Sequence, residues 1–197
     1  MKKILALVLA MVMMLSVAAC TANNNDDTQP VETTTAPIET TAPAVALSPL
    51  EVLETVWGLF GEDEQFFVMG GDFENMVDGA PGTVGLATPD FLTGNLIVPA
   101  EQVANVTAAA SLIHGMNANT FTAAAYTVAD VQAFAAAMQT AIQGNHWMCG
   151  FPEKLLIASA GGNVVVAFGH TDAVGPFKAH LTEAFADAEI LVDGAIG

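Results

Sequence analysis

Apolar residues recur at helical spacing in three stretches of the chain, and the first stretch has a clear start signal. Ser48 can cap a helix, Pro49 suits its first position, and Glu51 completes a capping box. Gly61 can end this helix. Four apolar residues fall on one of its faces: Leu50, Leu53, Trp57 and Phe60.

The second and third helical stretches lie toward the C-terminus. Thr127 and Asp130 resemble the start of a capped helix that Gly144 can close. Its core-facing residues are Val131, Phe134, Ala135, Met138 and Ile142. Thr171 can cap the third helix, but Pro176 favours a start nearer to that proline. The apolar face of the third helix comprises Phe177, Leu181, Ala184 and Phe185.

Short apolar runs between the helices predict strands. Four of these runs are 120–127, 154–160, 163–169 and 189–192. The two-residue connection Gly161-Gly162 predicts a β-hairpin. Residues 106–114 fit either a strand or the end of a helix that begins at Pro99. Residues 62–98, broken by glycine, proline and acidic residues, predict loops with one or two short strands.

The order of these elements indicates a fold class. From Thr120 onward it reads strand, helix, strand, strand, helix, strand. This order resembles the ferredoxin-like split β-α-β layout. We therefore expect an α+β fold in which an antiparallel sheet carries helices on one face. The βαββαβ order would cover about residues 120–193, after an N-terminal helix, within a single domain of residues 48–197.

The first twenty residues are typical of an export signal. Met1 and two lysines precede an apolar run that is shorter than the roughly 20 residues a membrane-spanning helix needs. The run ends in Val17-Ala18-Ala19-Cys20, which resembles the lipobox of bacterial lipoproteins. The resemblance implies a signal peptide at 1–19 and a lipid on Cys20, which becomes the first residue of the mature chain. The alternative is an ordinary secretory signal in which Cys20 is coincidental.

The segment that follows Cys20 reads as a tether. Residues 20–47 are rich in threonine, proline, alanine and asparagine and have no aromatic residue. Such a composition cannot bury enough apolar surface to offset chain entropy, so we expect the segment to be disordered. In an extended conformation it can reach about 80 Å. It would hold the folded domain away from a membrane.

Charge and cysteine content narrow the possible partners. The chain has 21 acidic and four basic residues, and loss of Lys2 and Lys3 with the signal would leave a net charge near −19. Nucleic-acid binding needs basic residues to neutralise phosphates, so we expect none. If Cys20 carries the lipid, Cys149 has no partner for an internal disulfide.

One segment contains residue types that bind soft metals. His146, Met148 and Cys149 supply imidazole, thioether and thiolate, which suit Cu(I), and His114 and Met116 can approach if the strands pair as predicted. The segment has neither a pair of cysteines nor two histidines at the His-x₃₋₅-His spacing that is typical of metal-binding motifs. The alternative is a structural plug in which Cys149 is a small apolar residue and the neighbouring Trp147 and Phe151 pack.

Other candidate chemistry is weaker. The acidic residues 62–64, with Asp72, Glu74 and Asp78, offer oxygen ligands for Ca²⁺. They lack the Asp-x-Asp-x-Asp-Gly spacing of an EF-hand loop, and the alternative is a set of solvated loop carboxylates. No nucleophile elbow or phosphate-binding loop occurs, and we predict no cofactor and no enzymatic activity.

The chain as a whole resembles small lipoproteins of Gram-positive gut bacteria. This resemblance implies an extracytoplasmic location, anchored to the cell membrane through Cys20, and implies no activity. We therefore expect a cell-surface binding or interaction domain for a protein, peptide or glycan ligand. The alternative is a copper-binding protein that uses His146, Met148 and Cys149.

Overall fold

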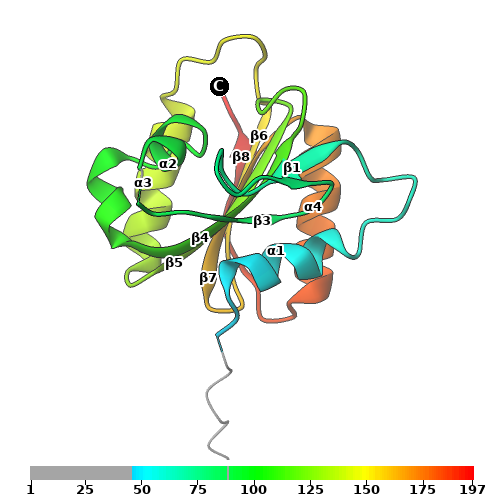
Figure 1. Ribbon diagram of the computed structural model, residues 1–197, viewed down its shortest axis with the longest axis horizontal. Helices are drawn as coiled ribbons and strands as arrows, with labels where there is room; N and C mark the ends of the chain where they lie inside the picture. Colours follow the sequence, from blue (N-terminus) through cyan, green and yellow to red (C-terminus); the bar gives the residue numbers. More distant parts are fainter. Residues whose placement is uncertain (1–45, 88) are drawn as a thin grey trace, which may run out of the picture. The chain divides into compact units, whose positions relative to one another are not determined.

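The computed structural model describes residues 46–87 and 89–197, which fall within one compact unit, Thr41–Gly197. Helices cover both faces of an open antiparallel sheet, so these residues form three layers (Figure 1). The predicted α+β class with an antiparallel sheet is confirmed.

The sheet has eight strands in the order β2-β1-β4-β5-β7-β6-β8, and β3 pairs with the same edge of β4 as β1 does. The strands are β1 (Val68–Gly70), β2 (Val77–Asp78), β3 (Gly82–Val84), β4 (Val106–His114), β5 (Phe121–Val128), β6 (Lys154–Ala160), β7 (Asn163–Gly169) and β8 (Glu189–Ala195). The helices are α1 (Pro49–Trp57), α2 (Asp90–Gly94), the 3₁₀ helix η1 (Ala100–Asn105), α3 (Val131–Gln143) and α4 (Thr171–Ala184).

Each face of the sheet packs against its own set of helices. Successive strand residues point to opposite faces. In β5, Phe121 and Ala123 therefore join α1 and α4 in one core, whereas Ala124 and Tyr126 join α2 and α3 in the other. Strands that are buried on both faces read as almost continuous apolar runs, which explains the composition of β6 and β7.

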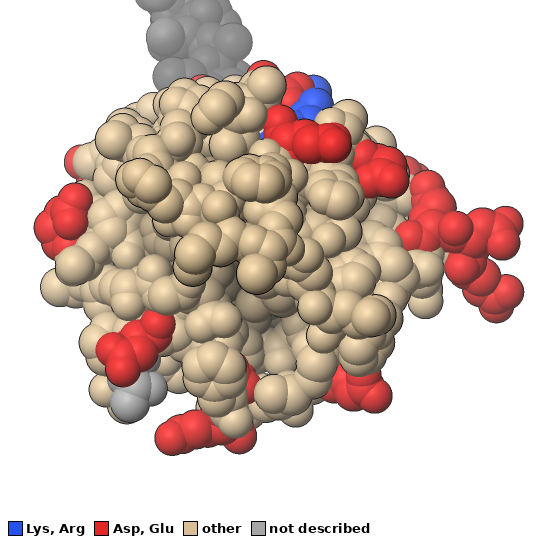
Figure 2. Space-filling model, turned by 90° about the horizontal axis from the view of Figure 1, so that it is seen from above, with Lys and Arg blue, Asp and Glu red and all other residues tan. Residues whose placement is uncertain are grey.

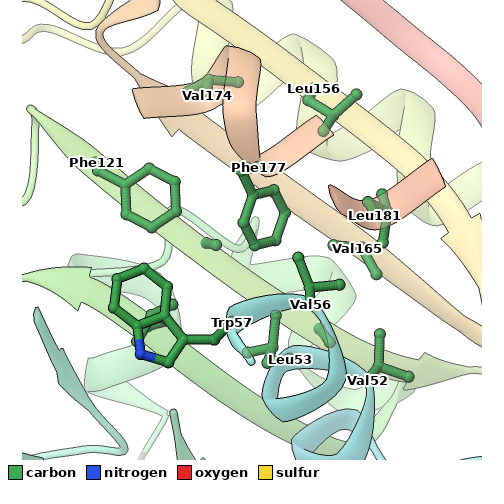
Figure 3. Packing of buried hydrophobic residues seen from close by; sticks show 14 of the residues in the cluster. Val52, Leu53, Val56, Trp57, Phe121, Leu156, Val165, Val174, Phe177 and Leu181 are labelled. Atoms are coloured by element: carbon green, nitrogen blue, oxygen red, sulfur yellow. The ribbon is translucent and has the colours of Figure 1, made fainter. Parts of the chain in front are cut away.

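The first core joins α1, α4 and the sheet through large apolar side chains (Figure 3). Phe177 of α4 lies against Phe121 of β5, with ring centroids 5.6 Å apart. Val56 of α1 and Leu181 of α4 are fully buried beside them. This core ties the first helix to the C-terminal half of the chain.

The expectation that the helices lie on one face of the sheet is wrong. Helix α3 connects β5 to β6, and α4 connects β7 to β8. In each case the second strand lies two positions nearer to the β8 edge of the sheet than the first. However, β5 and β7 run in opposite directions. Crossover connections between parallel strands are almost always right-handed. Two right-handed connections that shift the same way from antiparallel strands place their helices on opposite faces.

The ferredoxin-like arrangement is likewise not confirmed. The βαββαβ order is present along the chain, from β5 to β8. In the split β-α-β layout the last strand lies beside the first. Here β8 pairs with β6, and β4 occupies the position beside β5. Strand β4, from the N-terminal part of the domain, pairs with the edge of β5 that β8 would occupy in the ferredoxin-like layout.

Most local predictions are confirmed. The helix at Ser48 has the full capping box, and the Gly161-Gly162 hairpin is present. Residues 106–114 form strand β4, which settles the open alternative. Residues 62–98 hold three short strands and α2, more structure than expected.

Two helix starts differ from the sequence-based expectation. In α3 the cap is Asp130, whose carboxylate accepts a hydrogen bond from the Ala133 amide. In α4 the first residue is Thr171 rather than one near Pro176. The carboxylate of Glu153, which immediately precedes β6, accepts the Thr171 amide and so caps the helix from another part of the chain.

The predicted signal peptide, the lipobox at Cys20 and most of the tether at 20–47 lie outside the described residues. Within the described ranges, no helix combines the length and apolar character that crossing a membrane requires.

Candidate functional site

The two ends of the sheet differ in what lies on them. At one end, the backbone at Leu47 bonds to Gly161, and the Asn163 side chain donates to the Leu47 carbonyl at 2.8 Å. We call this the hairpin end. At the other end lie the β4–β5 turn, the loop 144–153 before β6 and the start of α4, at Thr171. We call this the distal end, because the chain enters the domain at the opposite one.

Asparagine side chains hold the distal loops together. The Asn117 side chain donates to the Cys149 carbonyl at 2.8 Å. The Asn119 side chain donates to the carbonyls of Met148 at 2.8 Å and Gly150 at 3.1 Å. These bonds join the β4–β5 turn to loop 144–153, which lies about thirty residues later in the sequence.

The soft-metal candidates project from this loop. His146 and Cys149 are exposed, and the Met148 side chain is 78% exposed. A small cavity is lined by His146 and Met148 but not by Cys149. In the part of the chain that the structure describes, no group of three or more His, Cys, Asp or Glu side chains could hold a metal ion. No structural observation favours the copper alternative.

Among the other residues named with the metal and structural-plug alternatives, His114 and Trp147 have structural contacts. Nδ1 of His114 accepts the backbone amides of Met116 and Asn117, at 3.2 and 3.3 Å, so this nitrogen shapes the β4–β5 turn. Trp147 packs on Phe168 with ring centroids 5.3 Å apart, as the structural-plug alternative expects. Phe151 does not pack, because it is 72% exposed.

An apolar cavity of about 260 Å³ opens at the distal end between β1, α2 and the β4–β5 turn. Three of its lining side chains are unusually exposed for their type: Phe73 at 71%, Met76 at 54% and Met116 at 84%. Phe91 of α2 forms part of its wall and contacts Phe73 edge to face. We call this the apolar cavity.

A second cavity, of about 450 Å³, lies between the segment 60–66, the end of β4 and the start of α4. Three exposed carboxylates line it: Asp63, Glu64 and Asp172. We call this the acidic cavity. His114 lines both cavities, so the two are neighbours.

Aromatic rings form part of the acidic cavity's lining. Phe66 stacks on His114, with ring centroids 5.6 Å apart and planes at 17°. Phe60 lies 6.5 Å from Phe66 and 4.7 Å from the His180 ring. The cavity therefore combines negative charge with aromatic surface.

The charges at this end are almost all negative. The described part of the chain contains two lysines and no arginine, and both Lys154 and Lys178 bind Asp193 of β8, at 2.8 and 2.6 Å. Figure 2 shows the molecule from above the view of Figure 1: an uncharged surface, hollowed near its centre, with carboxylates around it. No described lysine neutralises the carboxylates of the acidic cavity.

Glu64 shows how the acidic cavity is held in place. Its carboxylate accepts the Gly61 amide at 3.1 Å and contacts Nε2 of His180 at 3.1 Å. The Gly61 hydrogen bond, followed by that of His180, lowers the pKa of Glu64, so this group is ionised at neutral pH. Nδ1 of His180 lies 3.6 Å from the Glu183 carboxylate. No hydroxyl or thiol hydrogen-bonds to His180 in the described ranges.

Asp72 supports the rim of the apolar cavity. Its carboxylate accepts hydrogen bonds from the amides of Glu74, Asn75 and Gly85 and from the Asn75 side chain. Burial acts to raise the pKa of Asp72, but these hydrogen bonds outweigh it and the pKa is lowered. Asp72 thus acts as a structural carboxylate, not as one of a solvated or Ca²⁺-binding set.

Comparisons with protein-family models, with curated proteins and with solved structures found no match to this chain. The geometry of the distal end is therefore the basis for assigning a function.

Sequence reasoning did not identify the two cavities. Their linings come from segments that are far apart in the chain, near 60–76, 91–95, 113–120 and 172–176. One local signal was present: Phe66-Phe67 follows the acidic residues 62–64 after a single glutamine, Gln65, and this run does not alternate as a half-buried strand would. Exposed methionines cannot be recognised from sequence alone, since methionine usually packs in cores.

Proposed function

We propose that the protein is a bacterial lipoprotein, anchored outside the cytoplasm through Cys20, whose distal end binds a protein or peptide ligand without catalysis. The observation that carries this proposal is the position of the two cavities. They lie at the end of the sheet opposite to Leu47, where the chain from the anchor enters the domain. A domain tethered there can present its cavities away from the membrane.

The exposed side chains favour a peptide over a glycan or a nucleic acid. Methionine is adaptable and polarisable, and together with phenylalanine it is common in protein-binding surfaces. Phe73, Met76 and Met116 supply such a surface around the apolar cavity. The phenylalanine rings offer no hydrogen-bonding group for sugar hydroxyls, and the acidic surface repels phosphates.

The proposal is tested with cells that express the full chain. A random peptide library displayed on phage is selected against these cells, and the selected peptides are then measured on four strains: wild type, Cys20→Ala, Met76→Gln/Met116→Gln and Asp187→Asn. An antibody measures the amount of protein on each strain.

We expect three distinct results. Cys20→Ala releases the protein into the medium, so cells lose both antibody signal and peptide. The double methionine variant keeps the antibody signal but loses most peptide binding, because it makes the apolar cavity polar. Asp187→Asn, near the hairpin end, retains both. Peptides that bind the double methionine variant as well as wild type would contradict the proposed binding surface, and a Cys20→Ala protein that stays in the membrane would contradict the anchor.

A further inference from the structure

The acidic cavity differs from an ordinary acidic surface in its construction. It is a concave space of about 450 Å³ in which carboxylates from two separate elements face the same volume. Asp63 comes from the segment after α1, and Asp172 comes from the first turn of α4. Both are exposed, and neither makes a side-chain hydrogen bond or ion pair among the described residues. They are free to meet a charged ligand.

Apart from the contact between His180 and Glu64, the carboxylates of this space have no cationic partner within the described part of the molecule. Lys154 and Lys178 are bound to Asp193, on the opposite edge of the sheet from β1. Like charges around a concave surface with apolar walls strengthen one another's potential and raise the local concentration of opposite charge. A cation is the chemical complement of this cavity.

The aromatic lining narrows the kind of cation. Phe66, which is half-buried, presents ring surface to the same cavity as the carboxylates, and the buried Phe60 lies behind it in the lining. Ammonium and guanidinium groups are attracted to ring faces, by about 0.5–1 kcal/mol at exposed sites. A small metal ion would need several converging oxygen ligands, which this lining does not provide among the described residues. The lining fits an organic cation better.

The apolar cavity adjoins the acidic cavity. Both cavities include His114 in their lining, so one extended ligand can reach into both. His114 is held in place by the stacked Phe66 ring and by the backbone amides of Met116 and Asn117, which gives the boundary between the cavities a fixed position.

From charge complementarity and this adjacency, we propose that the distal end binds a cationic, amphipathic peptide segment. A lysine or arginine side chain enters the acidic cavity, and a nearby apolar side chain enters the apolar cavity. This proposal rests on the proposed function and specifies its ligand class. It assigns Asp63 and Asp172 to cation binding, and Met76 and Met116 to apolar contact.

The test uses the full-length protein and three synthetic hexapeptides, measured by titration calorimetry at low ionic strength. The peptides are acetyl-LKLKLK-amide, acetyl-LQLQLQ-amide and acetyl-GKGKGK-amide. The first has both features of the proposed ligand, and the other two each lack one of them. The protein variants are Asp63→Asn/Asp172→Asn and, as a control of equal charge change near the hairpin end, Asp187→Asn/Glu189→Gln.

We expect the leucine–lysine peptide to bind wild type about threefold to tenfold more tightly than the leucine–glutamine peptide, the range for one or two exposed ion pairs. It should also bind more tightly than the glycine–lysine peptide, which lacks the apolar side chains. The Asp63→Asn/Asp172→Asn variant should lose the preference for lysine over glutamine, and the control should keep it. Higher salt should reduce the preference, because exposed charges are screened.

Three results would overturn the inference. Equal binding of the lysine and glutamine peptides, or no binding of either, would exclude recognition of the cation. Equal loss of preference in both variants would show that overall charge, rather than the acidic cavity, attracts the peptide. Equal binding of the leucine–lysine and glycine–lysine peptides would exclude the apolar contact. The first two results would leave the proposed function standing, because the library selection could still yield apolar peptides without a basic residue that bind wild type and not the double methionine variant.

Discussion

At the scale of single residues, carboxylates in this protein divide into those that hold the backbone and those that face solvent. The Asp72 carboxylate is buried and accepts four hydrogen bonds, whereas the Asp78 carboxylate, a few residues later, is exposed and accepts none within the described ranges. The bonds to Asp72 fix the segment that carries Phe73 and Met76 at the apolar cavity. Sequence alone gives no sign of this division, since both residues lie in the same acidic, glycine-rich stretch.

We predict that Asp72→Ala lowers the free energy of unfolding by about 1–3 kcal/mol, because it removes the acceptor of four partly buried hydrogen bonds, three of them from backbone amides. Asp78→Ala is the matched control and should change it by less than about 0.5 kcal/mol. Urea-induced unfolding at pH 7 measures both. Equal effects of the two substitutions would contradict the structural role of Asp72.

The same comparison has a pH dependence with a defined sign. Because the pKa of Asp72 is lower in the folded state, its stabilising contribution is complete above the unfolded-state pKa, about 4. The contribution is lost as the pH falls through the folded-state pKa. The difference between wild type and Asp72→Ala should therefore be smaller at about pH 2.5 than at pH 7.

At the scale of elements, the β6–β7 hairpin joins the start of the domain to the sheet. Gly161 and Gly162 both have positive φ, 56° and 80°. A Cβ atom at Gly162 would lie 2.9 Å from that of Ala46. This turn therefore needs glycine both for its left-handed backbone and for the close approach of residue 46.

We predict that Gly162→Ala lowers the free energy of unfolding by about 1–2 kcal/mol or more, the cost of a left-handed backbone for a residue with a Cβ. Gly94→Ala, at the end of α2, is the control, since its Cβ would meet open space and its φ is not positive. The control should be neutral or slightly stabilising. A Gly162→Ala protein as stable as Gly94→Ala in thermal unfolding would show that the turn tolerates a side chain.

The elements themselves could be predicted from the sequence, but their layers could not. Capping signals and helical periodicity located the start of α1 and the extent of α3, because these signals are local, but α1 ends at Trp57 rather than at the predicted Gly61. The runs Leu155–Ile157 and Val164–Val166 do not alternate between apolar and polar residues. Such continuous apolar runs indicate that both faces of the sheet are covered. The choice of β6 rather than β5 as the partner of β8 depends on where β4 pairs. No local pattern encodes that choice.

At the scale of the whole molecule, three properties of the chain support the proposed function. The sequence proposes an anchor at Cys20 and a tether, and the structure places the entry of the chain at the hairpin end of the domain. The two cavities open at the other end, amid negative charge. The candidate residues His146, Met148 and Cys149 could be selected from the sequence by their chemical type. Residue type does not predict whether their side chains point toward one common site. The cavities depend on tertiary contacts between distant segments.

The central claim is that a peptide ligand contacts the distal end of the domain. The most direct test replaces Met116 with a photo-crosslinking amino acid in one strain and Asp187 in another. Intact cells that display the full chain are irradiated with a biotinylated random hexapeptide mixture, and biotin on the protein is measured. Our account predicts biotin on the protein with the crosslinker at position 116 and only background at position 187. Equal labelling at the two positions, or labelling at 187 alone, would contradict it.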